Sequence, residues 1–168
     1  MDQLTLLTQY KKWANERLFR ALALVSEEDL TRAQPIVFGS LLKTLNHVRA
    51  MDLVWKGHLE GTAHGFTTRN PDPSPPFAEV RRSQEEIDAW FVQYAVRLAP
   101  PVAVEVVEFE FIGGGKGVLT RSEMIMHCVN HGTYHRGNVA AMLYQIGRTP
   151  PTTDLPVYLR EIRAKALT

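Results

Sequence analysis

The sequence has little of what marks secreted, membrane or nucleic-acid-binding proteins. It holds one cysteine, Cys128, among 168 residues, so no disulfide can form within the chain, as is usual in reducing compartments. No apolar run approaches the roughly 18 residues that span a bilayer, and the polar N-terminal residues lack the apolar core of a signal peptide. Because 18 acidic residues nearly balance the 19 basic ones, the chain lacks the strong positive charge that binds nucleic acids or membrane surfaces. We expect a cytoplasmic protein with neither as a partner.

The composition that remains is that of an ordinary globular protein. Hydrophobic residues make up 45% of the chain and charged residues 22%. A chain of this length can bury one core of reasonable stability, and we expect a single domain over residues 1–168.

Apolar residues recur at steps of three and four through most of the chain, a spacing that predicts amphipathic helices. Ser40 is a suitable N-cap, Thr120 with Glu123 matches a capping box, and Gly147 is suited to end a helix. The segment SEEDL after the first helix is expected to be a turn with capping residues, and Ala99-Pro100-Pro101 is expected to end the third helix. The predicted helices cover about 2–25, 40–61, 77–98 and 120–146, with a short last helix over 154–166.

Two segments depart from the helical pattern. Residues 61–76 contain four prolines and two glycines, and this loop is longer than a simple connector needs to be, so we expect it to border a site. The segment VAVEVVEFEFIGGGKGVLTR alternates apolar residues with glutamates before a glycine-rich turn, which predicts a β-hairpin. Its GGGKG is not a phosphate-binding loop, because the glycine spacing is wrong and no serine or threonine follows the lysine. The fold class is therefore an all-α bundle with a small hairpin insertion.

Histidines form a stripe on the fourth predicted helix. His127, His131 and His135 are spaced four residues apart, so each lies about 40° from the next on one helix face. Two neighbours in such a stripe can place ring nitrogens on one divalent metal ion. We predict that His131 and His135 are ligands, while His127 is open to three roles: a ligand, a hydrogen-bond partner of a ligand, or a packed side chain.

A third ligand has to come from another part of the chain. His47, in an apolar stretch of the second helix, is the strongest candidate, and His58 and His64 are weaker ones. Three imidazoles suit zinc, nickel or ferrous iron, with a coordination position left for water.

Other polar residues near these histidines have simpler interpretations. Asp52 lies about 140° around the helix from His47, which favours a capping, ion-pair or interhelix hydrogen bond over metal binding. Cys128 is best interpreted as a small core residue. Asn138 lies about 20° from the direction of His131 and can support the site, whereas Tyr134 and Arg136 point away from that face.

Three motifs together resemble the DinB/YfiT-like metalloenzyme family. They are YKKWANERL, LNHVRAMDLVW and HCVNHGTYHRGNVAAML, in family order along nearly the whole chain. The resemblance implies an up-down-down-up four-helix bundle, a homodimer, and a divalent metal held by His47, His131 and His135. His127 then falls outside the ligand set.

The same resemblance implies chemistry on a small-molecule substrate. Relatives include S-transferases and isomerases that use a low-molecular-weight thiol such as mycothiol, bacillithiol or a glutathione-like compound. The sequence thus favours a metal-dependent enzyme that transfers a thiol or carries out metal-assisted hydrolysis. The alternative is a metal-binding stress-response protein without catalysis, although purely structural zinc usually has four protein ligands. The substrate and the thiol are not specified by the sequence.

Overall fold

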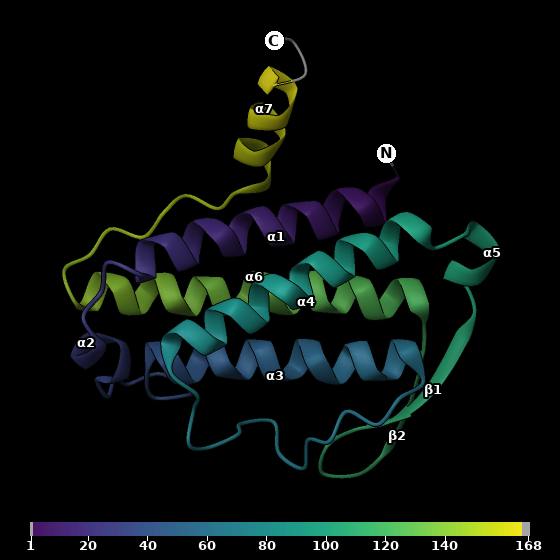
Figure 1. Ribbon diagram of the computed structural model, residues 1–168, viewed down its shortest axis with the longest axis horizontal. Helices are drawn as coiled ribbons and strands as arrows, with labels where there is room; N and C mark the ends of the chain where they lie inside the picture. Colours follow the sequence, from purple (N-terminus) through teal and green to yellow (C-terminus); the bar gives the residue numbers. More distant parts are fainter. Residues whose placement is uncertain (1, 166–168) are drawn as a thin grey trace.

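A computed structural model describes residues 2–165 of the chain, and it is built around four long helices (Figure 1). They are α1 (Gln3–Leu22), α3 (Leu41–Glu60), α4 (Phe77–Arg97) and α6 (Arg121–Gln145). Helices α1 and α6 run in one direction and α3 and α4 in the other, as the colour gradient in Figure 1 shows. The predicted all-α, up-down-down-up bundle with a hairpin insertion is therefore confirmed.

The helix ends follow from local capping. The side chains of Asp2 and Ser40 accept hydrogen bonds from the amides three residues later, at 3.0 and 3.2 Å. Thr120 and Glu123 form the predicted capping box. Gly61 ends α3 in the left-handed conformation, at a φ of 68° that a side chain would disfavour. Because these signals are local, the four long helices end within three residues of the predicted positions.

Two short helices correct the sequence interpretation. Helix α2 (Glu27–Thr31) replaces the turn expected at SEEDL, because Ser26 accepts from the amide of Asp29 and three acidic residues occupy the first turn. Helix α5 (Pro100–Ala103) begins with the prolines that were expected only to end α4, since proline is tolerated at the first helical position. Helix α7 (Leu155–Lys165) is the predicted last helix; its predicted end at residue 166 lies outside the described residues.

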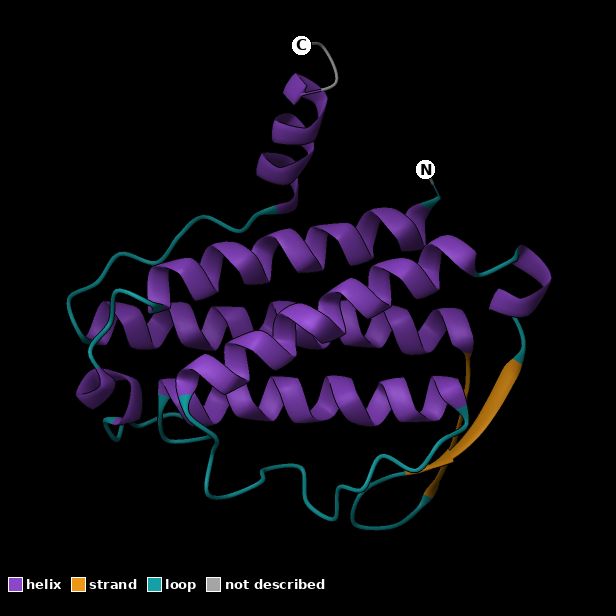
Figure 2. Ribbon diagram, in the orientation of Figure 1, coloured by secondary structure: helices purple, strands orange, loops and turns teal. Residues whose placement is uncertain are grey.

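The predicted hairpin is present (Figure 2). Strand β1 (Val106–Glu110) pairs antiparallel with β2 (Lys116–Thr120), from Val106 opposite Thr120 to Glu110 opposite Lys116. Strand β1 begins later than the alternating pattern indicated, because α5 occupies the preceding residues. Gly117 gives Phe109 room: a Cβ at Gly117 would lie 2.3 Å from the Phe109 ring.

The direction of the helices explains the long loop. Because α3 and α4 are parallel, the chain has to return along the length of the bundle between them. Residues 61–76 make this return beneath α3 in Figure 1. The loop is thereby brought beside α3, which carries His47.

No helix within the described residues is both long and apolar enough to cross a membrane.

Candidate metal centre

Three histidines from two helices converge on one point. The Nε2 atom of His131 lies 3.1 Å from Nε2 of His47 and 3.0 Å from Nε2 of His135. His47 comes from α3, while His131 and His135 lie one turn apart on α6. The cluster is well shielded, since the exposed fraction is 7% for His47 and 5% for His135. The three residues singled out in the sequence are thus brought together.

The surroundings of His47 determine which nitrogen faces the cluster. Its Nδ1–H donates to the carbonyl oxygen of Arg69 at 2.9 Å and to Oδ1 of Asn70 at 2.8 Å. A carbonyl can only accept, so the proton is on Nδ1 and Nε2 presents a lone pair to the other rings. This arrangement is the one that a metal-bound histidine needs.

The clustered histidines have lowered pKa values. Burial lowers the pKa of His131 to about 3, with a further contribution from the neighbouring rings of His135 and His47. Burial and then His47 lower the pKa of His135 to about 4. Near neutral pH the three rings are therefore uncharged, and no positive charge lies between Nε2 of His131 and the Nε2 atoms of His47 and His135.

The donor set of this cluster fits a divalent cation. One ring nitrogen from each of the three histidines lies within 4.8 Å of the others. Ligands at about 2.0–2.1 Å from a tetrahedral zinc ion are separated by roughly 3.3 Å, close to the spacing seen here. Neutral imidazoles also suit nickel and ferrous iron. The group could therefore hold a metal ion.

The outward-facing nitrogens of the three rings differ in their partners. The side-chain amide of Asn138 lies 3.2 Å from Nδ1 of His135, which is the supporting position expected for Asn138. Nδ1 of His131 is buried and has no hydrogen-bond partner among residues 2–165. Support for the ligands therefore comes from α6 for His135 and from the 61–76 loop for His47.

The remaining histidines lie outside the cluster. The ring of His127 stacks on His131 at 5.6 Å between centroids and contacts Trp55 at 4.7 Å, so it is a packed neighbour of the cluster. His58 and His64 contact each other at 5.2 Å further along α3 and into the loop. Neither joins the three-histidine group.

A cavity of about 460 Å³ opens beside the cluster. Its volume is within the range of small-molecule sites. Two of the clustered histidines are part of its wall, and the remainder is mostly apolar or aromatic. The lining residues are Val37, Phe38, His47, Met51, Trp55, Arg69, Asn70, Phe111, His127 and His131.

A second polar cluster lies on the other side of α6, inside the bundle. Lys11 on α1 is fully buried and forms ion pairs with Asp52, at 2.7 Å, and with Asp88. Burial lowers the pKa of Lys11, but the two carboxylates raise it more, so the ammonium stays charged. Asp52 is thus in the ion pair expected for it, and buried Cys128 is the expected core residue.

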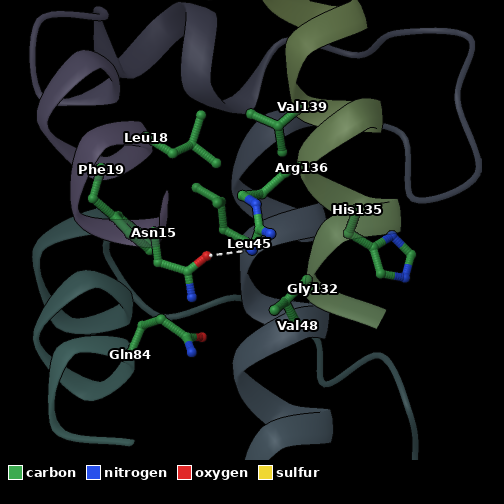
Figure 3. A pocket seen from close by; sticks show the side chains of 10 residues that line it. All are labelled: Asn15, Leu18, Phe19, Leu45, Val48, Gln84, Gly132, His135, Arg136 and Val139. Carbon is green, nitrogen blue, oxygen red and sulfur yellow. Dashed lines mark hydrogen bonds between the residues drawn. The ribbon is translucent and has the colours of Figure 1, made fainter. Parts of the chain in front are cut away.

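Arg136 belongs to this second cluster. Its guanidinium donates to Oδ1 of Asn15 at 3.1 Å. Figure 3 shows Arg136 turned toward Asn15, next to a small cavity of about 20 Å³, while adjacent His135 points to the opposite side of α6. The exposed ring of Tyr134 contacts His135 at 4.9 Å, although its position on the helix suggested that it would point away.

Sequence reasoning missed three residues at the site. Phe38 stacks on His47 with 4.1 Å between ring centroids, and Arg69 and Asn70 hold Nδ1 of that histidine. The length of the 61–76 loop was a signal that it borders a site, but no periodicity in a loop identifies the individual contacts. Phe38 lies in the turn before α3 and carries no sequence signal of its own.

Known proteins resemble this chain along most of its length. The model of the DinB family matches residues 1–164. The protein DinB of Bacillus subtilis strain 168 is 30% identical over 164 residues, which span 91% of each chain. The crystal structure of a DinB-like protein from Bacillus cereus ATCC 10987 superposes with a TM-score of 0.65 at 19% identity, over 87% of this chain and 94% of that one. The chain therefore belongs to the DinB family.

Proposed function

We propose that this protein is a metal-dependent enzyme that joins a low-molecular-weight thiol to an electrophilic small molecule. The observation that carries the proposal is the convergence of three histidine Nε2 atoms beside a cavity large enough for a small ligand. His47, His131 and His135 would hold the metal. A bound divalent cation lowers the pKa of a coordinated thiol, so that the nucleophilic thiolate exists near neutral pH.

The chain itself offers no suitable thiol. Cys128 is 1% exposed, and burial raises the pKa of its thiol well above the usual value. The nucleophile would therefore be a ligand rather than a side chain. In the reaction, a carbon–sulfur bond forms, the leaving group departs with the electron pair of its bond to carbon, and the thiol proton is released.

The cavity wall favours thiol transfer over hydrolysis. Helical zinc sites that hydrolyse peptides pair their two histidines with a glutamate that acts as general base. No aspartate or glutamate is among the residues that line this cavity. The apolar wall suits an uncharged electrophile and keeps water away from the thiolate.

The wider setting follows from the family resemblance and is part of the proposal. We expect a single-domain, cytoplasmic homodimer with zinc, nickel or ferrous iron at each three-histidine group.

Metal content tests the site directly. The purified protein is freed of metal, titrated with Co²⁺ and then with Zn²⁺ in competition, and compared with His131→Ala and His64→Ala. We expect one ion per chain in the wild type and in His64→Ala, since His64 lies outside the cluster. The affinity of His131→Ala should fall at least about a hundredfold, because two imidazoles hold a divalent ion weakly. Retention of one tightly bound ion by His131→Ala would refute the ligand assignment.

Turnover tests the chemistry. The Zn²⁺-loaded protein is mixed with 1-chloro-2,4-dinitrobenzene or monobromobimane and one of several thiols, including cysteine and glutathione. We expect conjugation that a chelator abolishes, that Zn²⁺ restores, and that His131→Ala lacks. One bound ion per chain with no turnover above the His131→Ala background would instead support the non-catalytic metal-binding function.

A further inference from the structure

We propose that Arg69 determines which ligand enters the cavity by binding a carboxylate that the thiol carries at the end remote from its sulfur. The inference rests on the proposed function, because it assigns the substrate class of the same site. It is drawn from the charges of the cavity wall, the anchoring of the loop that carries Arg69, and the absence of a competing acid.

The cavity wall carries a positive charge and no negative one. Among the ten residues that line the cavity, Arg69 alone carries a permanent charge. The other polar residues are three histidines and one asparagine, and the rest are apolar. A divalent ion at the histidines would add further positive charge. An anionic ligand is therefore favoured over a neutral or cationic one of the same shape.

The main chain of Arg69 is anchored at the cluster. Its carbonyl oxygen accepts from Nδ1 of His47, and the next residue, Asn70, accepts from the same atom. One residue further, the carbonyl oxygen of Pro71 accepts from the amide of Asn46 at 3.0 Å. Three consecutive residues of the loop are thus tied to α3, so Arg69 is held beside the histidines.

No carboxylate of the described chain competes for Arg69. Its guanidinium is in none of the ion pairs of residues 2–165, and the side chain is exposed. The acid in the adjoining cavity of about 230 Å³ is Asp72, and it lies 3.7 Å from Lys43. The guanidinium is therefore available to a ligand.

The other residues of the cavity wall indicate the chemistry of the middle of the ligand. Phe38, Trp55 and Phe111 contribute aromatic surface, and Met51 and Val37 contribute aliphatic surface. A ligand that fits has a sulfur at the histidines, an apolar middle and a carboxylate at Arg69. A guanidinium–carboxylate contact at an exposed side chain strengthens binding about twofold to fivefold.

Two thiols that differ only in charge test the inference. The probes are 6-mercaptohexanoate and its amide, 6-mercaptohexanamide, whose long chain prevents the carboxylate from binding the same metal ion as the sulfur. Each is titrated into the Co²⁺-loaded protein, and binding is followed by the thiolate-to-cobalt absorption band in the near ultraviolet. We expect the dissociation constant of the carboxylate to be about twofold to fivefold below that of the amide, a preference that weakens as salt is added.

Variants assign the preference to one side chain. Arg69→Gln should bind both thiols with equal strength, and Arg69→Lys should keep part of the preference. Arg82→Gln removes an exposed arginine of α4 outside the cavity and should behave as wild type. Because His47 contacts the main chain of Arg69, Arg69→Gln should still bind one Co²⁺ per chain, which is the control for folding.

Three results would overturn the proposal. Equal binding of the two thiols by the wild type, or an undiminished preference in Arg69→Gln, would refute the role of Arg69 and leave the proposed function intact. Absence of the absorption band with both thiols would refute thiol binding by the metal, and the present inference with it.

Discussion

Two polar clusters are buried in this bundle, and they are balanced in opposite ways. On one side of α6, Lys11 forms ion pairs with Asp52 and Asp88, and Arg136 joins the same cluster through Asn15, so that two positive side chains balance two negative ones. On the other side, the Nε2 atoms of three uncharged histidines converge. The charges of the first cluster are paired within the protein, and the adjoining cavity of about 20 Å³ is too small for a ligand. The second adjoins a cavity of about 460 Å³.

The same two helices contribute to both clusters. Helix α3 carries His47 on one face and Asp52 on another, and α6 carries His135 and Arg136 as neighbours about 100° apart (Figure 3). What differs is the partner that each face meets. We infer that a buried polar cluster with compensating charges holds helices together, whereas a cluster of uncharged histidines beside a cavity is a binding site.

Removing the cation of the first cluster should have the largest effect. Lys11→Met leaves two buried carboxylates without their partner and should lower the free energy of unfolding by about 3–5 kcal/mol. The neighbouring substitution Lys12→Met breaks only an exposed pair with Glu16 and should cost less than about 1 kcal/mol. Urea denaturation of both variants measures the difference. Similar midpoints for the two would mean that the ion pairs of Lys11 do not hold the helices.

Adding a cation to the second cluster should have a nearly comparable effect of opposite sign. Free Zn²⁺ at 100 to 1,000 times its dissociation constant should stabilise the fold by about 3–4 kcal/mol, because the ion binds the folded state alone. Thermal unfolding with and without Zn²⁺ measures this gain. The gain should persist in Lys12→Met and vanish in His135→Ala; an equal gain in His135→Ala would place the ion elsewhere.

Acid should weaken the metal-free protein through the second cluster. The pKa of His131 is about 3 and that of His135 about 4 in the folded state, against about 6.5 in an unfolded chain. Below pH 6.5 the unfolded chain therefore binds protons that the folded chain does not, and stability falls as the pH falls toward 4. We expect a loss of roughly 1–2 kcal/mol between pH 7 and 5 after solvent screening.

Unfolding at several pH values measures this dependence. The control is a double variant that carries both His131→Gln and His135→Gln. Because glutamine does not titrate in this range, the double variant should lose much less stability over the same interval. A metal-free wild type with the same profile as the double variant would contradict the role of these rings.

The contacts from the loop should have the smallest effect. Asn70→Ala removes one of the two acceptors for Nδ1 of His47 and leaves the carbonyl of Arg69. The affinity for Co²⁺ should fall about tenfold, the lower limit for partners of metal-bound histidines. Asn138→Ala, which removes the contact to His135, is the matched variant on α6. An unchanged affinity in Asn70→Ala would show that the loop is not needed to orient His47.

Local signals explain how much of the fold could be predicted. Ser40, Gly61 and the capping box of Thr120 act through amides within three residues, so their effects on the helix ends are visible in the sequence. The hairpin turn at 111–115 is local in the same way. The short helices α2 and α5 escaped prediction because proline and a run of acids are compatible with both a turn and a helix start.

For the site too, the sequence predicts only what depends on local spacing. By itself, the sequence determined that His131 and His135 share one face of one helix, because a four-residue spacing needs only helical geometry. It also indicated that Asp52 faces away from His47. Only the tertiary structure decided that His47 meets that pair, that Arg69 and Asn70 close over it, and that Lys11 reaches two acids from α3 and α4. These contacts join residues 22 to 84 positions apart, and such pairings depend on how the helices and the returning loop pack, which no local spacing encodes.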